Sequence, residues 1–319
     1  MTEIGHRYVA ANGLRMHIAE AGEGPLVLLL HGFPECWYSW RHQLTALAEA
    51  GFHAVAPDQR GYARTGGPRA VEDYALPHLV GDVVALLAAL GAPAATVVGH
   101  DWGAPVAWHT ALARPDLVRG VVGLSVPPAR RAPVPTLTAV REHFGPDFYQ
   151  LYFQRPGVEA EFEQDPREVF RRVLFGISGD IPEVHPMTVP AGQRFLDSWP
   201  SPAALPGWLT EADLDAYVAE FAESGFTGPL NWYRNIDRNW ALTALWDGAP
   251  ITPPALFLAG EKDPVISWQG TRDLDGAVRA LAPNLRGVEL YPGAGHWVQQ
   301  ERPEQVNAAL VEFATSLVH

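Results

Sequence analysis

The segment Thr96-Val97-Val98-Gly99-His100-Asp101-Trp102-Gly103 decides the fold that we predict for this chain. It joins an apolar, strand-like run to a helical stretch that begins at Ala104. The glycines at both ends leave room for a sharp turn, which would hold the central side chain in a strained, exposed position. That side chain is Asp101, a carboxylate that is ionised at neutral pH and can attack a saturated carbon. The structural alternative is an aspartate that caps the following helix.

Short apolar runs alternate with helical stretches on both sides of this turn. Such alternation predicts an α/β fold, with a mostly parallel sheet flanked by helices. The predicted strands are Leu26–Leu30, Ala54–Ala56, Thr96–Val98, Val118–Leu124, Ala255–Leu258 and Gly287–Leu290. The clearest helices are Leu76–Leu90, Ala104–Arg114 and Pro303–Val318.

The strand pattern stops between about Pro127 and Ala249. Thr210 followed by Asp213 indicates a helix start in this stretch. The proline- and glycine-rich segment Gly176–Gly207 is typical of a long loop, and its aromatic residues favour an ordered one. The sequence therefore predicts one sheet domain in two parts, residues 1–127 and 250–319, with a helical lid at 128–249.

Two further motifs follow predicted strands, where ligands of open parallel sheets bind. The loop that begins at His31 can aim the backbone N–H of Phe33 at Asp101, and together with the N–H of Trp102 it would form an oxyanion hole. A simple strand-ending turn is the alternative. Glycine and proline mark such turns in many proteins, so the motif predicts an oxyanion hole only in combination with the turn at Asp101.

An acid and a histidine follow the last two predicted strands. His296 can take a proton from water near neutral pH, and Asp263 can fix the tautomer of its ring. Glu261 is a rival acid two residues away, and we expect only one of the two to face the histidine. The chain has no Gly-x-Ser-x-Gly motif, which argues against an ordinary esterase or lipase.

Composition narrows the partners of this 319-residue chain. Its formal net charge of -13 disfavours nucleic acid and anionic membranes as partners. The single cysteine, Cys36, cannot form an internal disulfide and is expected to be a small buried side chain. No signal peptide, membrane span or zinc-ligand spacing is visible, so we expect a cytoplasmic protein without a metal. The excess of arginine over lysine suggests a bacterial source.

Four motifs resemble the soluble epoxide hydrolases of the α/β-hydrolase fold, such as the hydrolase domain of the mammalian enzymes and their bacterial relatives. They are His31-Gly32-Phe33-Pro34-Glu35-Cys36-Trp37-Tyr38-Ser39-Trp40-Arg41, Gly99–Gly103, Gln150–Gly157 and Gly228–Asn235. The resemblance runs over nearly the whole chain, although the loop Gly176–Gly207 departs from it. It implies epoxide hydrolysis without a cofactor, a cis peptide at Phe33–Pro34, and Tyr152 and Tyr233 as an acid pair.

The chemistry of phenols agrees with that pair. Opening an epoxide develops negative charge on its oxygen, and a phenol that stays protonated at neutral pH can donate to it. Without the resemblance, Tyr152 and Tyr233 would be read as packing aromatics. We expect the substrate to be a small apolar epoxide in a pocket lined by Phe33, Trp102 and Trp297 besides the tyrosines.

Two alternative functions remain at this stage. A haloalkane or haloacid dehalogenase also uses an aspartate and a histidine-activated water, but its halide needs N–H donors rather than phenols, and position 33 holds Phe where Asn would suit. The other is a catalytically silent ligand receptor. In such a protein we would expect some of the candidate catalytic residues to be replaced, whereas all of them are present here. The sequence leaves the natural epoxide, the enantiopreference and the formation of a homo-oligomer open.

Overall fold

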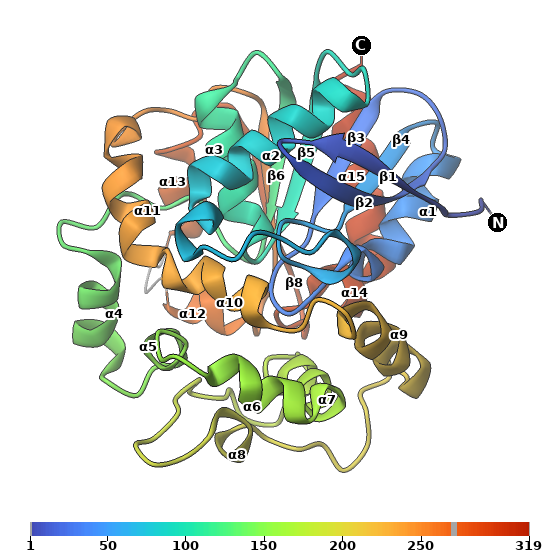
Figure 1. Cartoon of the computed structure of the whole chain (residues 1–319). Helices are drawn as coiled ribbons and strands as arrows, with labels where there is room; N and C mark the ends of the chain where they lie inside the picture. Colours follow the sequence, from blue (N-terminus) through green and yellow to red (C-terminus); the bar gives the residue numbers. More distant parts are fainter. Residues whose placement is uncertain (1, 269–272, 319) are drawn as a thin grey trace.

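A central eight-stranded sheet organises the protein, in the order β1-β2-β4-β3-β5-β6-β7-β8 (Figure 1). The computed structural model describes residues 2–268 and 273–318. The strands from β4 to β8 in this order run parallel, which confirms the predicted α/β class. They span Leu26–Leu30 (β3), His53–Pro57 (β4), Ala95–His100 (β5), Val118–Leu124 (β6), Ala255–Gly260 (β7) and Leu285–Tyr291 (β8).

An antiparallel hairpin at the edge of the sheet escaped the sequence analysis. It consists of β1 (Gly5–Ala11) and β2 (Leu14–Ala21). The turn residues Asn12 and Gly13 have φ values of 47° and 77°. An Asn-Gly pair between two extended runs is a strong hairpin signal because both residues tolerate positive φ, so this element could have been predicted.

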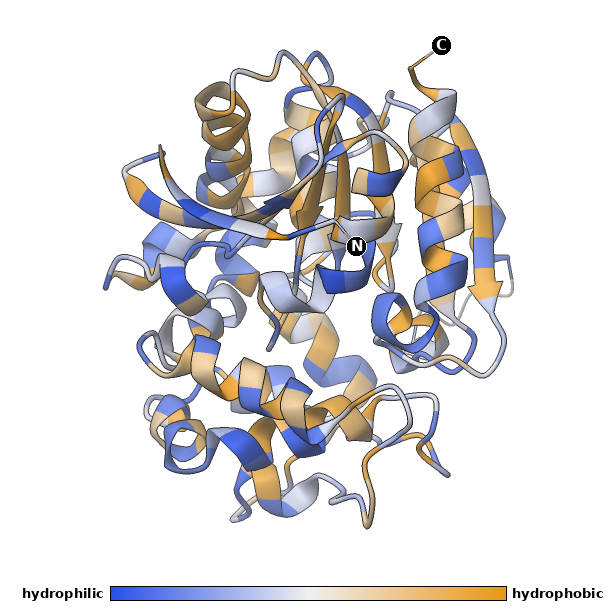
Figure 2. Ribbon diagram, turned by 90° about the vertical axis from the view of Figure 1, so that its right-hand side faces the viewer, coloured by the Kyte–Doolittle hydropathy of each residue, from blue (hydrophilic) through white to orange (hydrophobic). Residues whose placement is uncertain are grey.

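Helices cover both faces of the sheet and bury its apolar strands. Helices α1 (Arg41–Glu49) and α15 (Pro303–Ser316) pack together, and α2 (Leu76–Ala89) packs with α3 (Gly103–Ala113). Figure 2 shows the strands as apolar ribbons between these helices. Every residue of β3 and β5 is buried, as expected for parallel strands that are covered on both faces.

A helical lid is inserted between β6 and β7 and lies over the carboxyl ends of the strands (Figure 1). Its α9 begins with the expected capping box, in which Thr210 and Asp213 exchange hydrogen bonds. The lid helices are α4 (Thr136–Phe144), α5 (Tyr149–Tyr152), α6 (Val158–Gln164), α7 (Pro166–Gly176), α8 (Phe195–Ser198), α9 (Glu211–Phe221), α10 (Thr227–Arg234) and α11 (Ile236–Leu242).

The remaining short elements connect these layers. They are the α-helices α12 (Pro264–Trp268), α13 (Leu274–Arg279) and α14 (Val298–Glu301), and the 3-10 helices η1 (Trp37–Trp40), η2 (Ala63–Thr65), η3 (Val71–Tyr74) and η4 (Thr243–Trp246).

Two acidic side chains of α9 fasten the lid to the sheet domain. Glu220 accepts hydrogen bonds from Trp37 Nε1 at 3.0 Å and from Arg64 Nε at 2.8 Å. Asp213 accepts one from the Tyr38 hydroxyl at 3.0 Å. Both carboxylates are buried, so these partners are needed to offset the loss of water around them. These contacts join α9 of the lid to the sheet domain.

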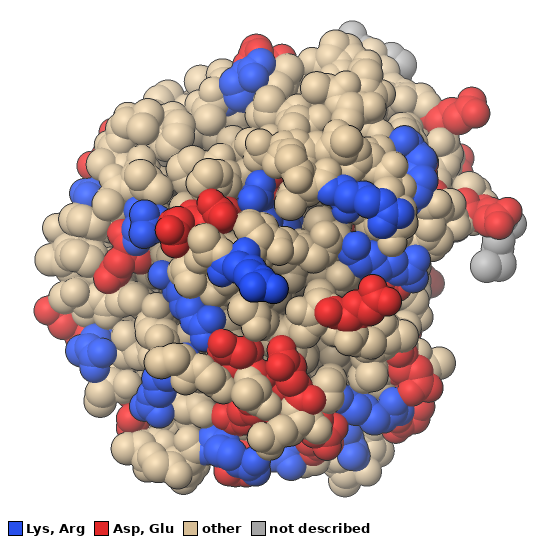
Figure 3. Space-filling model, viewed as in Figure 1, with Lys and Arg blue, Asp and Glu red and all other residues tan. Residues whose placement is uncertain are grey.

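The outer surface mixes charges of both signs. In Figure 3, basic and acidic side chains alternate over the face that is drawn. Many of them form exposed ion pairs, such as Arg114 with Asp116 at 2.6 Å. No helix in the described ranges is both long and apolar enough to cross a membrane.

The crossing of β5 and α3 depends on the two glycines that flank the turn. A Cβ atom on Gly99 would lie 2.1 Å from the carbonyl oxygen of Gly103, and one on Gly103 would lie 2.1 Å from that of Leu30. Both obstacles are backbone atoms, which cannot rotate away. The close approach of strand and helix thus excludes any side chain at positions 99 and 103.

We therefore expect Gly103→Ala to lower the free energy of unfolding by about 3 kcal/mol, the upper range for an overpacked site. Gly207→Ala is the matched control because no heavy atom lies within 4 Å of its added Cβ, and it should change stability by less than about 0.5 kcal/mol. Urea unfolding followed by circular dichroism measures both. Equal midpoints for the two variants would contradict the close-crossing argument.

Candidate active site

Asp101 occupies the turn between β5 and α3 with a φ of 49°. Its Oδ1 accepts a hydrogen bond from the backbone N–H of Phe33 at 2.8 Å. No side chain caps α3, so the capping alternative is wrong for this carboxylate. The strained turn instead presents the carboxylate toward the lid, in the position expected of a nucleophile.

His296 stands beside Asp101, and Asp263 lies behind it. The imidazole Nε2 is 3.5 Å from Asp101 Oδ2, and Nδ1 is 3.1 Å from Asp263 Oδ1. Asp263 is fully buried, whereas Glu261 is exposed to solvent. The structure thus brings Asp263, and not its rival Glu261, to the histidine.

The loop that carries His296 is pinned on both sides by Glu301. This buried carboxylate accepts hydrogen bonds from the N–H groups of Gly295 at 2.8 Å and Trp297 at 3.1 Å. It also accepts one from Gly179 of the lid at 2.9 Å. The sequence analysis missed Glu301 because its partners are backbone groups, which leave no side-chain pattern.

His100, the residue before Asp101, belongs to a buried polar cluster under the site. His100 Nδ1 is 2.7 Å from Glu35 Oε2, and its Nε2 is 2.8 Å from the carbonyl oxygen of His296. Gln299 and Gln300 each donate to Glu35 Oε1 at 3.0 Å. The cluster supports the backbone of His296, and the His100 side chain does not compete with that of Asp101 for the cavity.

The electrostatics favour a charged pair at neutral pH. Burial by itself lowers the pKa of His296, but the charges of Asp263 and Asp101 and the hydrogen bonds to them outweigh it and raise the pKa to about 10. Burial would raise the pKa of Asp101, but His296, together with the Phe33 N–H, lowers it below its usual value. The resting site therefore holds two carboxylates around one imidazolium.

Only one of the two expected tyrosines lines a cavity with Asp101. Tyr233, on α10, lines a cavity together with Asp101, Phe33 and His296. Its ring meets those of Phe33 and Trp102 edge to face, each at 5.2 Å between centroids. Burial raises its pKa well above the ordinary value, so the phenol stays protonated.

The placement of Tyr152 at this cavity is wrong, and Tyr149 takes its place. The Tyr152 hydroxyl donates to Glu161 Oε2 at 2.5 Å, and Arg155 stacks over its ring. Tyr149 lines both cavities that border Asp101, and burial raises its pKa too. Both tyrosines lie on the single turn α5. Glu161, which engages the hydroxyl of Tyr152, lies on a different helix, so the sequence of α5 alone does not show which tyrosine faces the cavity.

Asp101 lies between two cavities. A narrow one of about 30 Å³ extends beneath the lid loop and is lined by Ile177, Met187 and Trp199 in addition to the residues named above. A wider one of about 530 Å³ opens past Trp102 toward α4. Their walls are mostly apolar side chains, which suits an apolar ligand.

Trp297 does not belong to either cavity wall, so its expected role in the pocket is wrong. It is fully buried, and its Nε1 donates to the carbonyl oxygen of Leu174 at 2.8 Å. Its ring packs edge-on against His296 at 4.7 Å between centroids. Trp297 follows His296 in the sequence, but its ring packs against the imidazole and does not line the two cavities at Asp101.

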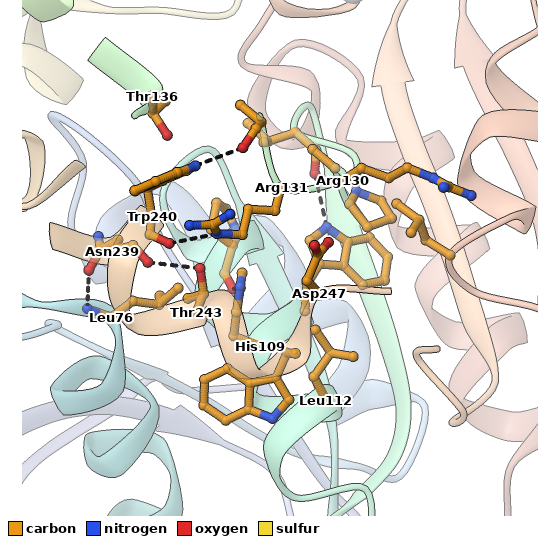
Figure 4. A pocket seen from close by; sticks show the side chains of 18 of the residues that line it. Leu76, His109, Leu112, Arg130, Arg131, Thr136, Asn239, Trp240, Thr243 and Asp247 are labelled. Atoms are coloured by element: carbon orange, nitrogen blue, oxygen red, sulfur yellow. Dashed lines mark hydrogen bonds between the residues drawn. The ribbon is translucent and has the colours of Figure 1, made fainter. Parts of the chain in front are cut away.

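A third cavity of about 360 Å³ lies where the two connections between lid and sheet domain meet (Figure 4). It shares Trp102 with the wider cavity. Arg131 stacks on Trp240 at 3.7 Å and donates from Nε to its carbonyl oxygen at 3.0 Å. Trp240 Nε1 donates in turn to the carbonyl oxygen of Ala132 at 2.8 Å, so the two connections are locked together.

The Phe33–Pro34 peptide is cis, as the resemblance implied. Within residues 2–268 and 273–318, no group of three or more His, Cys, Asp or Glu side chains is arranged to hold a metal ion.

Comparison with known proteins gives likenesses over nearly the whole chain. A family model described as the alpha/beta hydrolase fold matches residues 25–303. Epoxide hydrolase A of Mycobacterium tuberculosis is 49% identical over 317 residues, which cover 98% of this chain and 97% of that protein. The solved structure of an epoxide hydrolase from an endophytic Streptomyces has a TM-score of 0.94 and 47% identity, and covers 98% of this chain and 96% of that one. Bifunctional epoxide hydrolase 2 of Rattus norvegicus is 37% identical over 315 residues, 98% of this chain but 55% of that protein.

The charged pair predicts an unusual titration of His296. We expect nuclear magnetic resonance of its imidazole to give a pKa near 10. The histidine should therefore stabilise the fold fully below its unfolded pKa of about 6.5, and this contribution should be lost as the pH rises toward the folded pKa. Comparing the pH dependence of unfolding in the wild type and in His296→Gln isolates it.

Asp263→Asn should lower the pKa of His296 by more than about one unit because it removes an adjacent charge. Glu261→Gln is the control and should leave it unchanged, since that carboxyl is exposed. A pKa of His296 that responds equally to both substitutions would show that the histidine does not depend on Asp263.

Proposed function

Because this chain belongs to the epoxide hydrolases of the α/β-hydrolase fold, we propose that it opens an epoxide with the carboxylate of Asp101 and releases a vicinal diol with water activated by His296 and Asp263. The observation that carries the proposal is the geometry at the turn. One carboxylate oxygen of Asp101 contacts the Phe33 N–H, the other faces His296, and two phenols line the same cavity.

The first step is attack on the epoxide carbon. Oδ1 of Asp101 is engaged by the Phe33 N–H, so Oδ2 is the nucleophile. A bond forms between Oδ2 and carbon while the carbon–oxygen bond of the epoxide breaks. The oxygen that leaves takes a proton from Tyr149 or Tyr233, whose pKa values are raised by burial. The products are an ester on Asp101 and a phenolate.

Ester formation prepares the histidine for the second step. Asp101 loses its charge when it becomes an ester, and with it goes one of the two carboxylates that keep His296 protonated. The proton of the imidazolium is then free to neutralise the phenolate. His296 is left neutral, with Nδ1–H toward Asp263 and Nε2 able to accept a proton from water.

The second step is hydrolysis of the ester. Water gives a proton to His296 Nε2 and adds to the ester carbonyl carbon. The negative charge falls on Oδ1, which already lies 2.8 Å from the N–H of Phe33. We place the second donor of this oxyanion hole at the backbone N–H of Trp102, at the start of α3. Collapse expels the diol, which takes the proton from His296, and the new carboxylic acid returns its own proton to the imidazole.

The cavities favour an apolar epoxide as substrate. Phe33, Trp102, Tyr149 and Tyr233 border the space in front of Asp101. The lid, which we place at residues 128–249, closes that space from above. A halide would need N–H donors where these phenols stand, so the dehalogenase reading loses its support. The complete set of reacting groups likewise disfavours a silent receptor.

A single turnover in heavy-oxygen water tests the covalent step. The proposal expects label in the carboxylate of Asp101 and an unlabelled diol, because water attacks the ester and not the epoxide. Peptide and product mass spectrometry measure both, and Asp101→Asn should abolish turnover. Label in the diol with none in Asp101 would mean direct attack of water on the epoxide and would refute the ester.

The phenols are tested by removing their hydroxyl groups. Tyr149→Phe combined with Tyr233→Phe should slow ester formation by at least about a hundredfold, since general acids contribute on that scale, while substrate binding changes little. Tyr152→Phe is the matched control, because its hydroxyl is engaged by Glu161, and should keep nearly the full rate. Rapid-quench kinetics resolve the step. A larger loss in Tyr152→Phe than in the double variant would reverse the assignment.

A further inference from the structure

Ser125 sits in a strained turn at the end of β6. Its φ is 69°, and the N–H of Val126 donates to the carbonyl oxygen of Leu124 at 2.8 Å, so Ser125 is the central residue of a γ-turn with positive φ. Such turns are rare and cost free energy, and they persist where the surroundings enforce them. Here the Ser125 N–H is fixed to the carbonyl oxygen of Leu258 at 2.9 Å, and the residue is fully buried.

The turn aims the hydroxyl of Ser125 at the active histidine. Its Oγ lies 2.8 Å from His296 Nδ1, closer than the two carboxylate oxygens of Asp263 at 3.1 and 3.3 Å. A serine oxygen can accept or donate, but an Nδ1 that carries a proton can only donate. The proton on Nδ1 is therefore shared between Asp263 and Ser125.

We propose that Ser125 is a positioning residue for the second step of the reaction: its hydroxyl oxygen and Asp263 together hold the Nδ1 proton of His296, which keeps Nε2 free and aimed at the ester. This inference rests on the proposed function, because it assigns Ser125 a part in ester hydrolysis. Two acceptors on different strand ends fix the plane of the ring better than one, since a single hydrogen bond permits rotation about its axis.

The contact is specific to one step. Attack by Asp101 on the epoxide requires no base, so the orientation of His296 matters little there. Hydrolysis requires Nε2 to face a water molecule beside the ester, and a ring that tilts would lose that alignment. Removal of the hydroxyl should therefore slow hydrolysis and let the ester accumulate.

The charged and titratable neighbours of His296 are two aspartates and a second histidine. Asp263 and Asp101 face its two ring nitrogens, and the ring of His100 lies 4.9 Å from it, backed by Glu35. Ser125 adds a neutral dipole to this set. Its loss should make the protonated ring less stable without changing the count of charges.

The test compares Ser125→Ala, Ser125→Gly and the control Ser39→Ala. Ser39 is also fully buried, but its hydroxyl donates to the carbonyl oxygen of Cys36. In both Ser125 variants we expect ester formation within about twofold of the wild type, hydrolysis slowed about tenfold, and a His296 pKa lower by about one unit, the scale of one hydrogen bond to a charged group. Ser39→Ala should match the wild type in all three.

Ser125→Gly separates the hydroxyl from the strained turn, since glycine adopts positive φ without cost. A Ser125→Gly variant that hydrolyses the ester at the wild-type rate would overturn the proposal, and so would an unchanged His296 pKa in Ser125→Ala. Intact-protein mass spectrometry of His296→Gln, which lacks the base for hydrolysis and would retain the ester, shows whether an ester forms at all. If none forms, the proposed function fails, whereas the His296 pKa still decides whether Ser125 holds the ring.

Discussion

Two carboxylates around one buried imidazolium are the constraint on which the structure depends. Asp263 and His296 are almost fully removed from water and Asp101 is mostly so, and buried charges are tolerated only with close partners in good geometry. Each of the three comes from the carboxyl end of a different strand, so the register of the parallel sheet sets their distances. Gly99 and Gly103 allow α3 to cross β5 next to Asp101, and Glu301 binds the backbone of the loop that carries His296. Both features fix the backbone at a charged residue of the site.

This arrangement gives the proposed reaction its order. While Asp101 is charged, His296 is held as a cation and cannot act as a base; once Asp101 is an ester, only Asp263 remains to stabilise the cation. The base is thus released by the chemistry that creates the need for it. A histidine without the second carboxylate would not change its pKa when the ester forms and would lack this coupling.

The sequence was informative where local pattern determines structure. Apolar runs located the parallel strands, and the turn at Asp101 with the strand ends at Asp263 and His296 located the charged groups, because strand ends of a parallel sheet converge. The sequence was uninformative where a contact with a residue distant in the chain decides which side chain enters the site. Tyr149 and Tyr152 lie on one helical turn, and Glu161 on another helix engages the hydroxyl of Tyr152. The hairpin at Asn12-Gly13 was a different case, since its turn signal was present and was not used.

The loop 176–207 forms part of the wall of the narrow cavity. The loop 176–207 holds little regular structure, yet Trp199 stacks on Phe195 at 4.8 Å between centroids, and Gly179 is tied to Glu301. Met187 adopts a φ of 55° in this loop and lines the narrow cavity. A strained residue needs rigid surroundings, so the loop is a fixed wall of the cavity. Since the proposed roles of Asp101 and His296 are the same for any epoxide, discrimination between epoxides would come from the residues that line the cavities, of which this loop supplies a part.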